Sequence, residues 1–240
     1  MKIRLDRLLV EHGLADSREK AQALIMAGEV LVNGQKAAKP GQAVDAGSAL
    51  EVLARPPYVS RGGFKLAAAL REFAIEVTGK TCLDVGASTG GFTDVLLQAG
   101  AARVHAVDVG SGQIDWKLRQ DSRVVLHEGV NARNLRFEHI GELVDFIACD
   151  VSFISVTLIL PAIVPLLRPA GQMVILIKPQ FEVGKGQVGK GGIVREPELH
   201  QAACARIADA VRQCGFRIAI MESPILGAEG NKEFLLYAQH

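Results

Sequence analysis

The chain has 240 residues, of which 49% are hydrophobic and 22% are charged, and its formal net charge is +1. These values are typical of a globular protein with a sizeable core, and they exclude a long disordered polypeptide. The near-neutral charge gives no sign of a nucleic-acid partner by itself.

The sequence gives no sign of membrane insertion, secretion or metal binding. The longest apolar stretch, residues 153–167, contains two prolines and is shorter than the ~20 residues that cross a bilayer. Charges interrupt the apolar start MKIRLDRLLVEHG, unlike the start of a signal peptide. The four cysteines have the spacing neither of zinc ligands nor of a redox pair: Cys82, Cys149, Cys204 and Cys214. We therefore expect a reduced, soluble, cytoplasmic protein without a metal.

Residues 1–53 are expected to form a compact unit that begins with two helices. The pattern predicts the first helix over 4–13 and a second over 16–28, each ended by a glycine. Asp16 and Glu19 have the spacing of a capping box at the start of the second helix.

A small sheet should complete this unit. Asn33-Gly34 lies in an alternating stretch and is a strong hairpin signal, and residues 48–53 form a further expected strand. The adjacent prolines in ARPPYVS, residues 54–60, prevent a helix and predict a stiff linker. A domain boundary is expected there.

Residues 61–240 alternate between short apolar strands and amphipathic helices. Continuous apolar strands separated by helices predict a mostly parallel sheet that is covered on both faces. The last two strands, FRIAIMES and KEFLLYA, have no helix between them and should form an antiparallel pair at the sheet edge. The predicted fold class is a doubly wound α/β domain with a small N-terminal α+β unit.

A glycine-rich turn is the first candidate for a ligand site, because ligands of open α/β sheets bind at the carboxyl ends of strands. In LDVGASTGGFT, residues 83–93, a strand ends at Val85 and a helix begins near Phe92. Asp108 ends the next strand, where a carboxylate can accept hydrogen bonds from ribose hydroxyls. Together these features favour an adenosine-type cofactor over a purely structural turn.

Two charged residues end later strands. Asp150 and Lys178 follow long apolar strands, and burying either side chain unpaired would be costly. Both are therefore expected to face the cleft, although a structural salt bridge between them is the alternative interpretation. Lys65, on the helix before the first strand, and Glu233, at the start of the last strand, would be unremarkable surface charges in isolation.

This set of residues resembles the Lys-Asp-Lys-Glu tetrad of the FtsJ/RrmJ-type ribose 2′-O-methyltransferases, at Lys65, Asp150, Lys178 and Glu233. Over essentially its whole length the chain resembles the TlyA family, historically labelled hemolysin A. The similar stretches include YVSRGGFKL, LDVGASTGGFTD, CDVSFIS, IKPQFEVGKG and GNKEFLLY. The resemblance implies a Rossmann-like class I methyltransferase sheet with an N-terminal S4-like RNA-binding domain. It also implies S-adenosylmethionine as cofactor and 2′-O-methylation of cytidines in ribosomal RNA as activity.

The resemblance suggests a role for each candidate site residue. Lys178 would take or polarise the hydroxyl proton, with Asp150 orienting it, while Lys65 would hold the sugar–phosphate and Glu233 would position Lys65 or the ribose. The two lysines could also exchange these roles. The expected cofactor contacts are Gly86, Ser88, Thr89, Gly90, Gly91, Phe92 and Asp108, with Glu128 and Asn131 as weaker candidates at the adenosine end. A proline that often precedes the double glycine in FtsJ-type turns is replaced by Thr89, which should alter the stiffness of the turn.

Basic residues are the candidates for RNA contact. Those on the N-terminal helices would be an ordinary solvated face on charge alone, but the S4 resemblance implies a face for structured RNA. The expected RNA contacts are Lys2, Arg4, Arg7, Arg18, Lys20, Arg61, Lys185 and Lys190. The last two lie in VGKGQVGKGG, residues 183–192, which lacks the Ser or Thr of a phosphate-binding loop. We expect this segment to be a lid that touches RNA phosphates, with a flexible connector as the alternative.

Three other functions remain as alternatives. A methyltransferase of small molecules or proteins would not need an RNA-binding appendage. A non-catalytic RNA-binding protein with a relic cofactor fold would be expected to lack tetrad residues, and all four are present. A membrane-lytic protein would need a spanning segment or a strongly amphipathic cationic helix.

Overall fold

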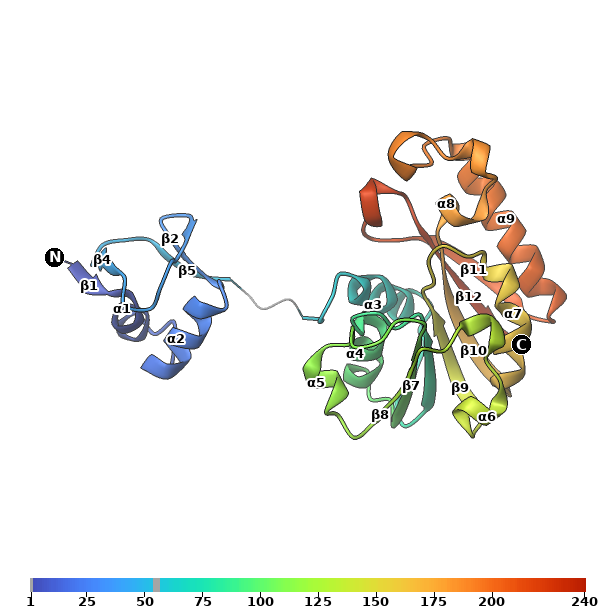
Figure 1. The fold of residues 1–240 in the computed structure, drawn as a ribbon, viewed down its shortest axis with the longest axis horizontal. Coiled ribbons are helices and arrows are strands. Elements are labelled where there is room, and N and C mark those ends of the chain that lie inside the picture. The colour runs from blue at the N-terminus through green and yellow to red at the C-terminus, as the bar shows by residue number, and fades with distance from the viewer. Residues whose placement is uncertain (1, 54–56) are drawn as a thin grey trace. The chain divides into compact units, whose positions relative to one another are not determined.

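The computed structural model describes residues 2–53 and 57–240, without the side chains of residues 185 and 228 (Figure 1). The chain divides into two compact units, Met1–Pro57 and Tyr58–His240. Part of the predicted linker, residues 54–56, lies outside the described residues, and its last three residues belong to the second unit.

The first unit packs two helices against two small antiparallel sheets. One sheet pairs β1 with β4, and the other has the order β3-β2-β5. The elements are β1 Lys2–Arg4, α1 Leu5–Glu11, α2 Arg18–Met26, β2 Val30–Val32, β3 Gln35–Lys36, β4 Ala43–Asp45 and β5 Leu50–Val52. Leu5, Leu8 and Leu9 of α1 and Ile25 of α2 are buried together in a core of their own.

Local sequence explains most of this unit. Asn33 and Gly34 have φ of 50° and 79° between β2 and β3, which confirms the predicted hairpin. The predicted capping box was wrong: the Ser17 side chain caps α2 by accepting from the Lys20 amide at 3.2 Å. Asp16 lies outside the helix and pairs with the Lys20 ammonium at 2.5 Å.

The second unit is built on a seven-stranded sheet of order β11-β12-β10-β9-β6-β7-β8. Its strands are β6 Thr81–Val85, β7 Arg103–Asp108, β8 Val124–Glu128, β9 Val144–Cys149, β10 Leu167–Ile177, β11 Arg217–Glu222 and β12 Phe234–Gln239. Five strands are parallel, and β12 runs antiparallel to both β10 and β11. The expected antiparallel pair at the sheet edge is confirmed.

Helices cover both faces of this sheet, as Figure 1 shows. The α-helices are α3 Gly62–Glu72, α4 Gly91–Gln98, α5 Trp116–Arg119, α6 Phe137–Ile140, α7 Leu160–Ile163, α8 Pro179–Glu182 and α9 Pro197–Gln213. Short 3₁₀ turns span η1 Ala132–Asn134, η2 Val156–Leu158, η3 Val164–Leu166, η4 Lys185–Gln187, η5 Lys190–Gly192 and η6 Ala228–Gly230. Pro197 is the first residue of α9, a position that suits proline because its missing N–H would have no partner within the helix.

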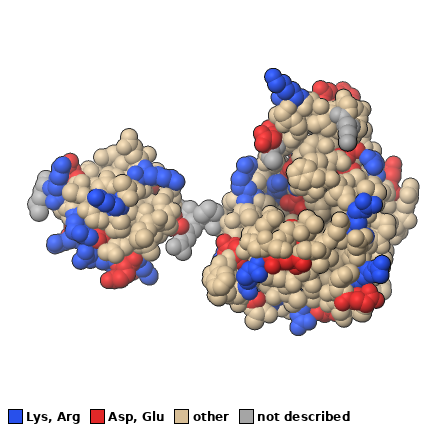
Figure 2. All heavy atoms as spheres, in the orientation of Figure 1, with Lys and Arg blue, Asp and Glu red and all other residues tan. Residues whose placement is uncertain are grey.

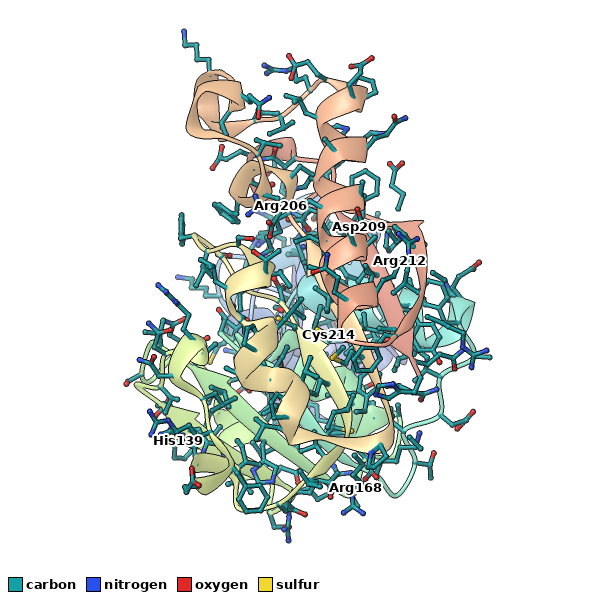
Figure 3. All side chains as sticks on the ribbon, turned by 90° about the vertical axis from the view of Figure 1, so that its right-hand side faces the viewer. His139, Arg168, Arg206, Asp209, Arg212 and Cys214 are labelled. Carbon is teal, nitrogen blue, oxygen red and sulfur yellow. The ribbon has the colours of Figure 1, made fainter. Side chains whose placement is uncertain are left out.

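Side chains of the central strands alternate between two hydrophobic cores. Phe146 and Ala148 of β9 pack with α3 and α4, whereas Ile147 and Cys149 pack with α7 and α9. Figure 3 faces α9, with Arg206, Asp209 and Arg212 along it. The predicted doubly wound α/β fold is confirmed. Within residues 2–53 and 57–240, no helix is long and apolar enough to cross a membrane.

Candidate active site

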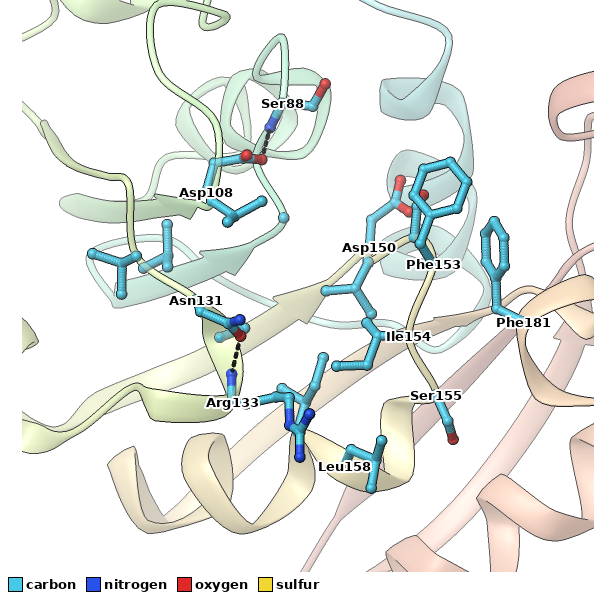
Figure 4. A pocket seen from close by; sticks show the side chains of 18 of the residues that line it. Ser88, Asp108, Asn131, Arg133, Asp150, Phe153, Ile154, Ser155, Leu158 and Phe181 are labelled. Atoms are coloured by element: carbon cyan, nitrogen blue, oxygen red, sulfur yellow. Dashed lines mark hydrogen bonds between the residues drawn. The ribbon is translucent and has the colours of Figure 1, made fainter.

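A cleft of about 940 Å³ opens where the carboxyl ends of β6, β7 and β9 meet (Figure 4). Five of the site residues predicted from the sequence line this cleft: Gly86, Ser88, Asp108, Asn131 and Asp150. They follow or end four different strands, so the parallel sheet is what brings them together. The cleft therefore lies where the sequence predicted a ligand site.

The glycine turn after β6 needs glycine at its first position. Gly86 has φ of +86°, and a Cβ there would lie 2.2 Å from the Asp150 carbonyl oxygen. Any other residue would push the turn away from the strand that carries Asp150. Gly90 has φ of +94° and caps α4, which places the free amides of that helix at the turn.

Asp108 ties the turn to the end of β7. Its Oδ2 accepts from the Ser88 amide at 2.8 Å, shown in Figure 4, and its Oδ1 accepts from the Gly110 amide at 2.7 Å. Both oxygens are therefore held in place at the cleft wall. A carboxylate held in this way can also accept hydrogen bonds from the hydroxyls of a ribose.

The other expected cofactor residues have different surroundings. Phe92, the second residue of α4, is buried in the hydrophobic core. Glu128 accepts from the Gly112 amide at 2.7 Å and pairs with Arg119 at 2.5 Å, away from the cleft lining. The Asn131 side chain accepts from the Arg133 amide at 3.0 Å, as Figure 4 shows, and lies at the cleft. The remaining three, Thr89, Gly90 and Gly91, form the turn and the first residue of α4.

The four tetrad positions form two Lys–carboxylate pairs. Lys178 Nζ lies 2.6 Å from Asp150 Oδ1 and donates to Ser152 Oγ at 2.8 Å. The two side chains of this pair are only 13% and 20% exposed. An ion pair that reaches the surface of a cleft matches both interpretations of the sequence, the functional one and the structural salt bridge.

The second pair joins Lys65 of α3 to Glu233 just before β12, and both residues are buried. Gly227 makes room for it, since a Cβ there would lie 2.0 Å from Glu233 Oε1. Ile177 of β10 pairs with Phe234 of β12, so Lys178 and Glu233 are the next residues on adjacent strands. The two ion pairs therefore belong to neighbouring strand ends.

Asp84 is a candidate that the sequence reasoning missed. It is fully buried on β6, and its Oδ2 accepts from Thr93 Oγ1 at 2.6 Å. Among the described residues its Oδ1 has no hydrogen-bond partner. Burial raises the pKa of Asp84 to about 7, with the nearby Asp150 and Asp108 adding to the rise and Thr93 opposing it. The sequence does contain a signal for Asp84, because an acidic residue inside an apolar strand, two positions before Gly86, is unusual.

Two phenylalanines at the cleft were also missed. The Phe153 side chain is 91% exposed on a backbone with φ of +65°, which is rare for a bulky residue. Its ring lies 5.0 Å from that of Phe181, and both line the cleft (Figure 4). A strained backbone conformation costs free energy and is most often found at functional sites. The exposed ring of Phe153 is therefore a candidate for ligand contact.

The basic residues expected to contact RNA are exposed in both units. Lys2, Arg4, Arg7, Arg18 and Lys20 lie on β1, α1 and α2, and Figure 2 shows Lys and Arg side chains gathered on the first unit. Arg61 donates to the Leu226 carbonyl at 3.0 Å. Lys190 is exposed on η5, whereas the side chain of Lys185 lies outside the described part.

The segment 183–192 is fixed at its far end. The Asn231 side chain, two residues before Glu233, donates to the Gly192 carbonyl and accepts from the Val194 amide, each at 3.0 Å. No α-helix follows it until Pro197, unlike the helix that follows a phosphate-binding loop.

Comparison with known proteins agrees with these two units. The FtsJ-like methyltransferase family matches residues 58–240, and the S4 domain matches residues 3–50. The chain belongs to the FtsJ-like methyltransferase family. The resemblance drawn from the sequence is thereby confirmed.

Individual relatives extend this likeness over both units. The 16S/23S rRNA (cytidine-2′-O)-methyltransferase TlyA of Mycobacterium tuberculosis is 48% identical, covering 98% of this chain and 89% of its own. Hemolysin A of Brachyspira hyodysenteriae is 45% identical over 98% of this chain and 99% of its own. The solved structure of a Streptococcus thermophilus protein, 45% identical, superposes with a TM-score of 0.75, covering 99% of this chain and 88% of that one.

Proposed function

We propose that this FtsJ-like methyltransferase transfers a methyl group from S-adenosylmethionine to the 2′-hydroxyl of a cytidine ribose in ribosomal RNA, in the cytoplasm. One observation carries the proposal. The Lys65–Glu233 and Lys178–Asp150 pairs lie at neighbouring strand ends beside a glycine turn, in a chain 48% identical to an rRNA (cytidine-2′-O)-methyltransferase.

The residues around the turn fit such a cofactor. Gly86 lets the turn pack closely against the Asp150 carbonyl at the cleft wall, and Asp108 offers a fixed carboxylate to a ribose. Among the described residues the buried Oδ1 of Asp84 has no hydrogen-bond partner, and an ordered water beneath the turn would satisfy it. When bound, the sulfonium supplies an electrophilic methyl carbon.

The chain's own contribution is to orient the hydroxyl and to handle its proton. A ribose hydroxyl is a poor nucleophile, and methyl transfer depends on in-line approach more than on covalent help. The hydroxyl oxygen would form the new C–O bond while the methyl–sulfur bond breaks. Lys178 Nζ would accept the hydroxyl proton as a neutral amine, after releasing a proton to Asp150 or to solvent, because an ammonium cannot accept one. Asp150 and Ser152 hold that nitrogen at 2.6 and 2.8 Å.

The second pair would serve the sugar–phosphate. Lys65 is held by the buried Glu233, and a fixed ammonium suits a ribose oxygen or a phosphate. Exchange of roles between the two lysines is the alternative. The exposed basic residues of the first unit would contact the RNA backbone, which positions the substrate without reading its sequence.

The proposal is tested by transfer of tritiated methyl from S-adenosylmethionine to unmodified ribosomal subunits. We expect label in RNA ribose with the wild type and a loss of at least about 100-fold with Lys178→Ala, because general acid–base groups contribute about 10²–10⁴-fold. Lys80→Ala is the matched control, since Lys80 precedes β6 at the opposite end of the sheet and should leave the rate unchanged.

Each result has a distinct meaning. If labelling survives Lys178→Ala, Lys65 is the residue that accepts the hydroxyl proton, and Lys65→Ala should then abolish labelling. Binding of S-adenosylmethionine by wild type without any labelling of RNA would remove ribosomal RNA as substrate and favour a small-molecule or protein substrate.

A further inference from the structure

Asp6 in the first unit is a fully buried carboxylate at the start of α1. It accepts four hydrogen bonds from side chains. Arg4 donates from Nε to Oδ1 at 3.1 Å and from Nη2 to Oδ2 at 2.7 Å. Oδ2 also accepts from Arg18 at 3.3 Å and from Gln22 at 3.0 Å, both on α2. The carboxylate thus joins the β1–α1 junction to the second helix.

The two arginines that meet at Asp6 are themselves half exposed. The side chains of Arg4 and Arg18 are 53% and 54% exposed, whereas the carboxylate between them is 0% exposed. Each guanidinium therefore has one edge on Asp6 and further N–H groups toward solvent. The hydrogen bond from Arg4 is the largest cause that holds the pKa of Asp6 well below its usual value, so the carboxylate stays charged at neutral pH.

Other ion pairs of the same unit are built differently. Glu11, which pairs with Arg7, and Asp16, which pairs with Lys20, are 42% and 83% exposed. Such pairs contribute little and leave the basic side chain free to move. A buried carboxylate, by contrast, is costly to desolvate, and apolar residues of similar size are often as stable. The lowered pKa of Asp6 means that the charged carboxylate stabilises the folded unit at neutral pH, and the same contacts fix the two arginines in place.

We propose that Asp6 is a positioning residue that holds Arg4 and Arg18 in one fixed arrangement for contact with RNA phosphates. The proposal rests on the proposed function, in which this unit binds ribosomal RNA. An arginine side chain loses rotamer freedom when it binds a phosphate, and a side chain that is already ordered loses less. Two guanidinium groups on one carboxylate also keep a constant separation, which favours a particular spacing of phosphates.

Asp6→Asn separates this role from simple charge. The substitution removes one negative charge, so electrostatics alone predicts tighter RNA binding. Positioning predicts the opposite, with an increase in Kd for a ribosomal RNA substrate of about tenfold. The KM for RNA should rise by a similar factor, whereas kcat at saturating RNA should be unchanged because the active site lies in the other unit.

Two variants serve as controls in the same assay. Asp16→Asn makes the same charge change at an exposed pair, and its Kd should stay equal to or slightly below that of the wild type. Gln22→Ala removes the uncharged donor to Asp6 but keeps both arginine contacts, and it should also leave the Kd unchanged. A loss of affinity in Gln22→Ala as large as in Asp6→Asn would indicate general loosening of the unit and overturn the proposal.

A second pair of substitutions does not depend on how well Asp6→Asn folds. Replacing Arg4 and Arg18 together by Lys keeps the net charge but removes the planar fork that the carboxylate holds. We expect about a tenfold weaker Kd for the double lysine variant. Unchanged affinity in that variant, or tighter binding by folded Asp6→Asn, would overturn the positioning role. If wild type itself failed to bind or methylate RNA, the proposed function would fall instead.

Discussion

Asp84 is a buried carboxyl group whose surroundings favour its protonated form. Its carboxyl group is enclosed beneath the glycine turn, with Thr93 as donor to one oxygen. Burial disfavours the charged form, and two further carboxylates, those of Asp150 and Asp108, raise the pKa further, to about 7. Because this buried carboxyl group is costly, we expect Asp84 to have a role in the adjacent cofactor site.

The raised pKa of Asp84 predicts a pH-dependent stability. Because the pKa is raised on folding, the protonated acid is favoured in the folded state, and the stability it provides is lost as pH rises from about 4 through 7. Asp84→Asn removes this loss, so it should stabilise the protein relative to wild type more at pH 8 than at pH 5. The gain should be on the order of 1 kcal/mol for each pH unit across that window.

Thermal unfolding across pH 5 to 8 measures this difference. The melting temperature of Asp84→Asn minus that of wild type should grow by several degrees over the range. Asp209→Asn on the exposed side of α9 is the control, and its difference from wild type should stay constant. Parallel curves for Asp84→Asn and wild type would show that the buried carboxyl does not titrate in this range.

Elements were predictable where a strong local signal coincides with a buried position. Asn33-Gly34 fixed the hairpin, and the apolar strands before Asp108, Asp150 and Lys178 ended within one residue of the predicted points. The three-residue strands β1 and β4 were not predicted, since so short a segment carries no period. The predicted cap of α2 was Asp16 and the observed one is Ser17. Both residue types are good helix caps, so the sequence alone does not distinguish them.

The loop between β9 and η2 is an element whose role the sequence did not reveal. Glu182 of α8 is buried and accepts from Ser155 Oγ at 2.6 Å and from the Val156 amide at 2.8 Å. Burial raises the pKa of Glu182, against these two hydrogen bonds. Arg206 of α9, labelled in Figure 3, donates to the Glu182 carbonyl at 2.7 Å. The loop that presents Phe153 is therefore held by α8, which is held in turn by α9.

A loop held in this way suggests a stacking surface for the target base. Phe153→Ala should raise the KM for RNA or lower the methylation rate by about tenfold to 100-fold, since stacking of one base on an aromatic ring contributes about 1–3 kcal/mol. The Kd for S-adenosylmethionine should change by less than twofold. Phe153→Trp, which keeps a stacking surface, should retain most of the activity, whereas equal losses in both variants would exclude stacking.

The sequence predicted the division into two units but not all of the contacts that build the active site. Composition and the two prolines placed the boundary near the point where the structure divides, after Pro57. A salt bridge between Asp150 and Lys178 was one interpretation of the sequence, whereas the Lys65–Glu233 pair could not be derived from the residues alone, since these two lie 168 positions apart. Their pairing depends on α3 and β12 meeting across the sheet, which only the tertiary fold decides.

Separate cores imply separable tasks for the two units. The first unit buries its own cluster around Leu5 and Leu9, and the second contains the cleft and both ion pairs. A chain beginning at Tyr58 should therefore fold and bind S-adenosylmethionine with a Kd within about threefold of the full chain. Its methylation of ribosomal RNA should fall by at least about tenfold at low RNA concentration, through a higher KM, because the basic residues of the first unit are missing.

Salt dependence distinguishes lost phosphate contacts from a damaged site. If the first unit contacts several phosphates, the affinity of the full chain for RNA should fall steeply with salt, and that of the shortened chain should fall less steeply. Equal slopes for the two chains would mean that the first unit makes no phosphate contact. A shortened chain that methylates RNA as well as the full chain at every concentration would assign substrate recognition to the cleft and its own loops.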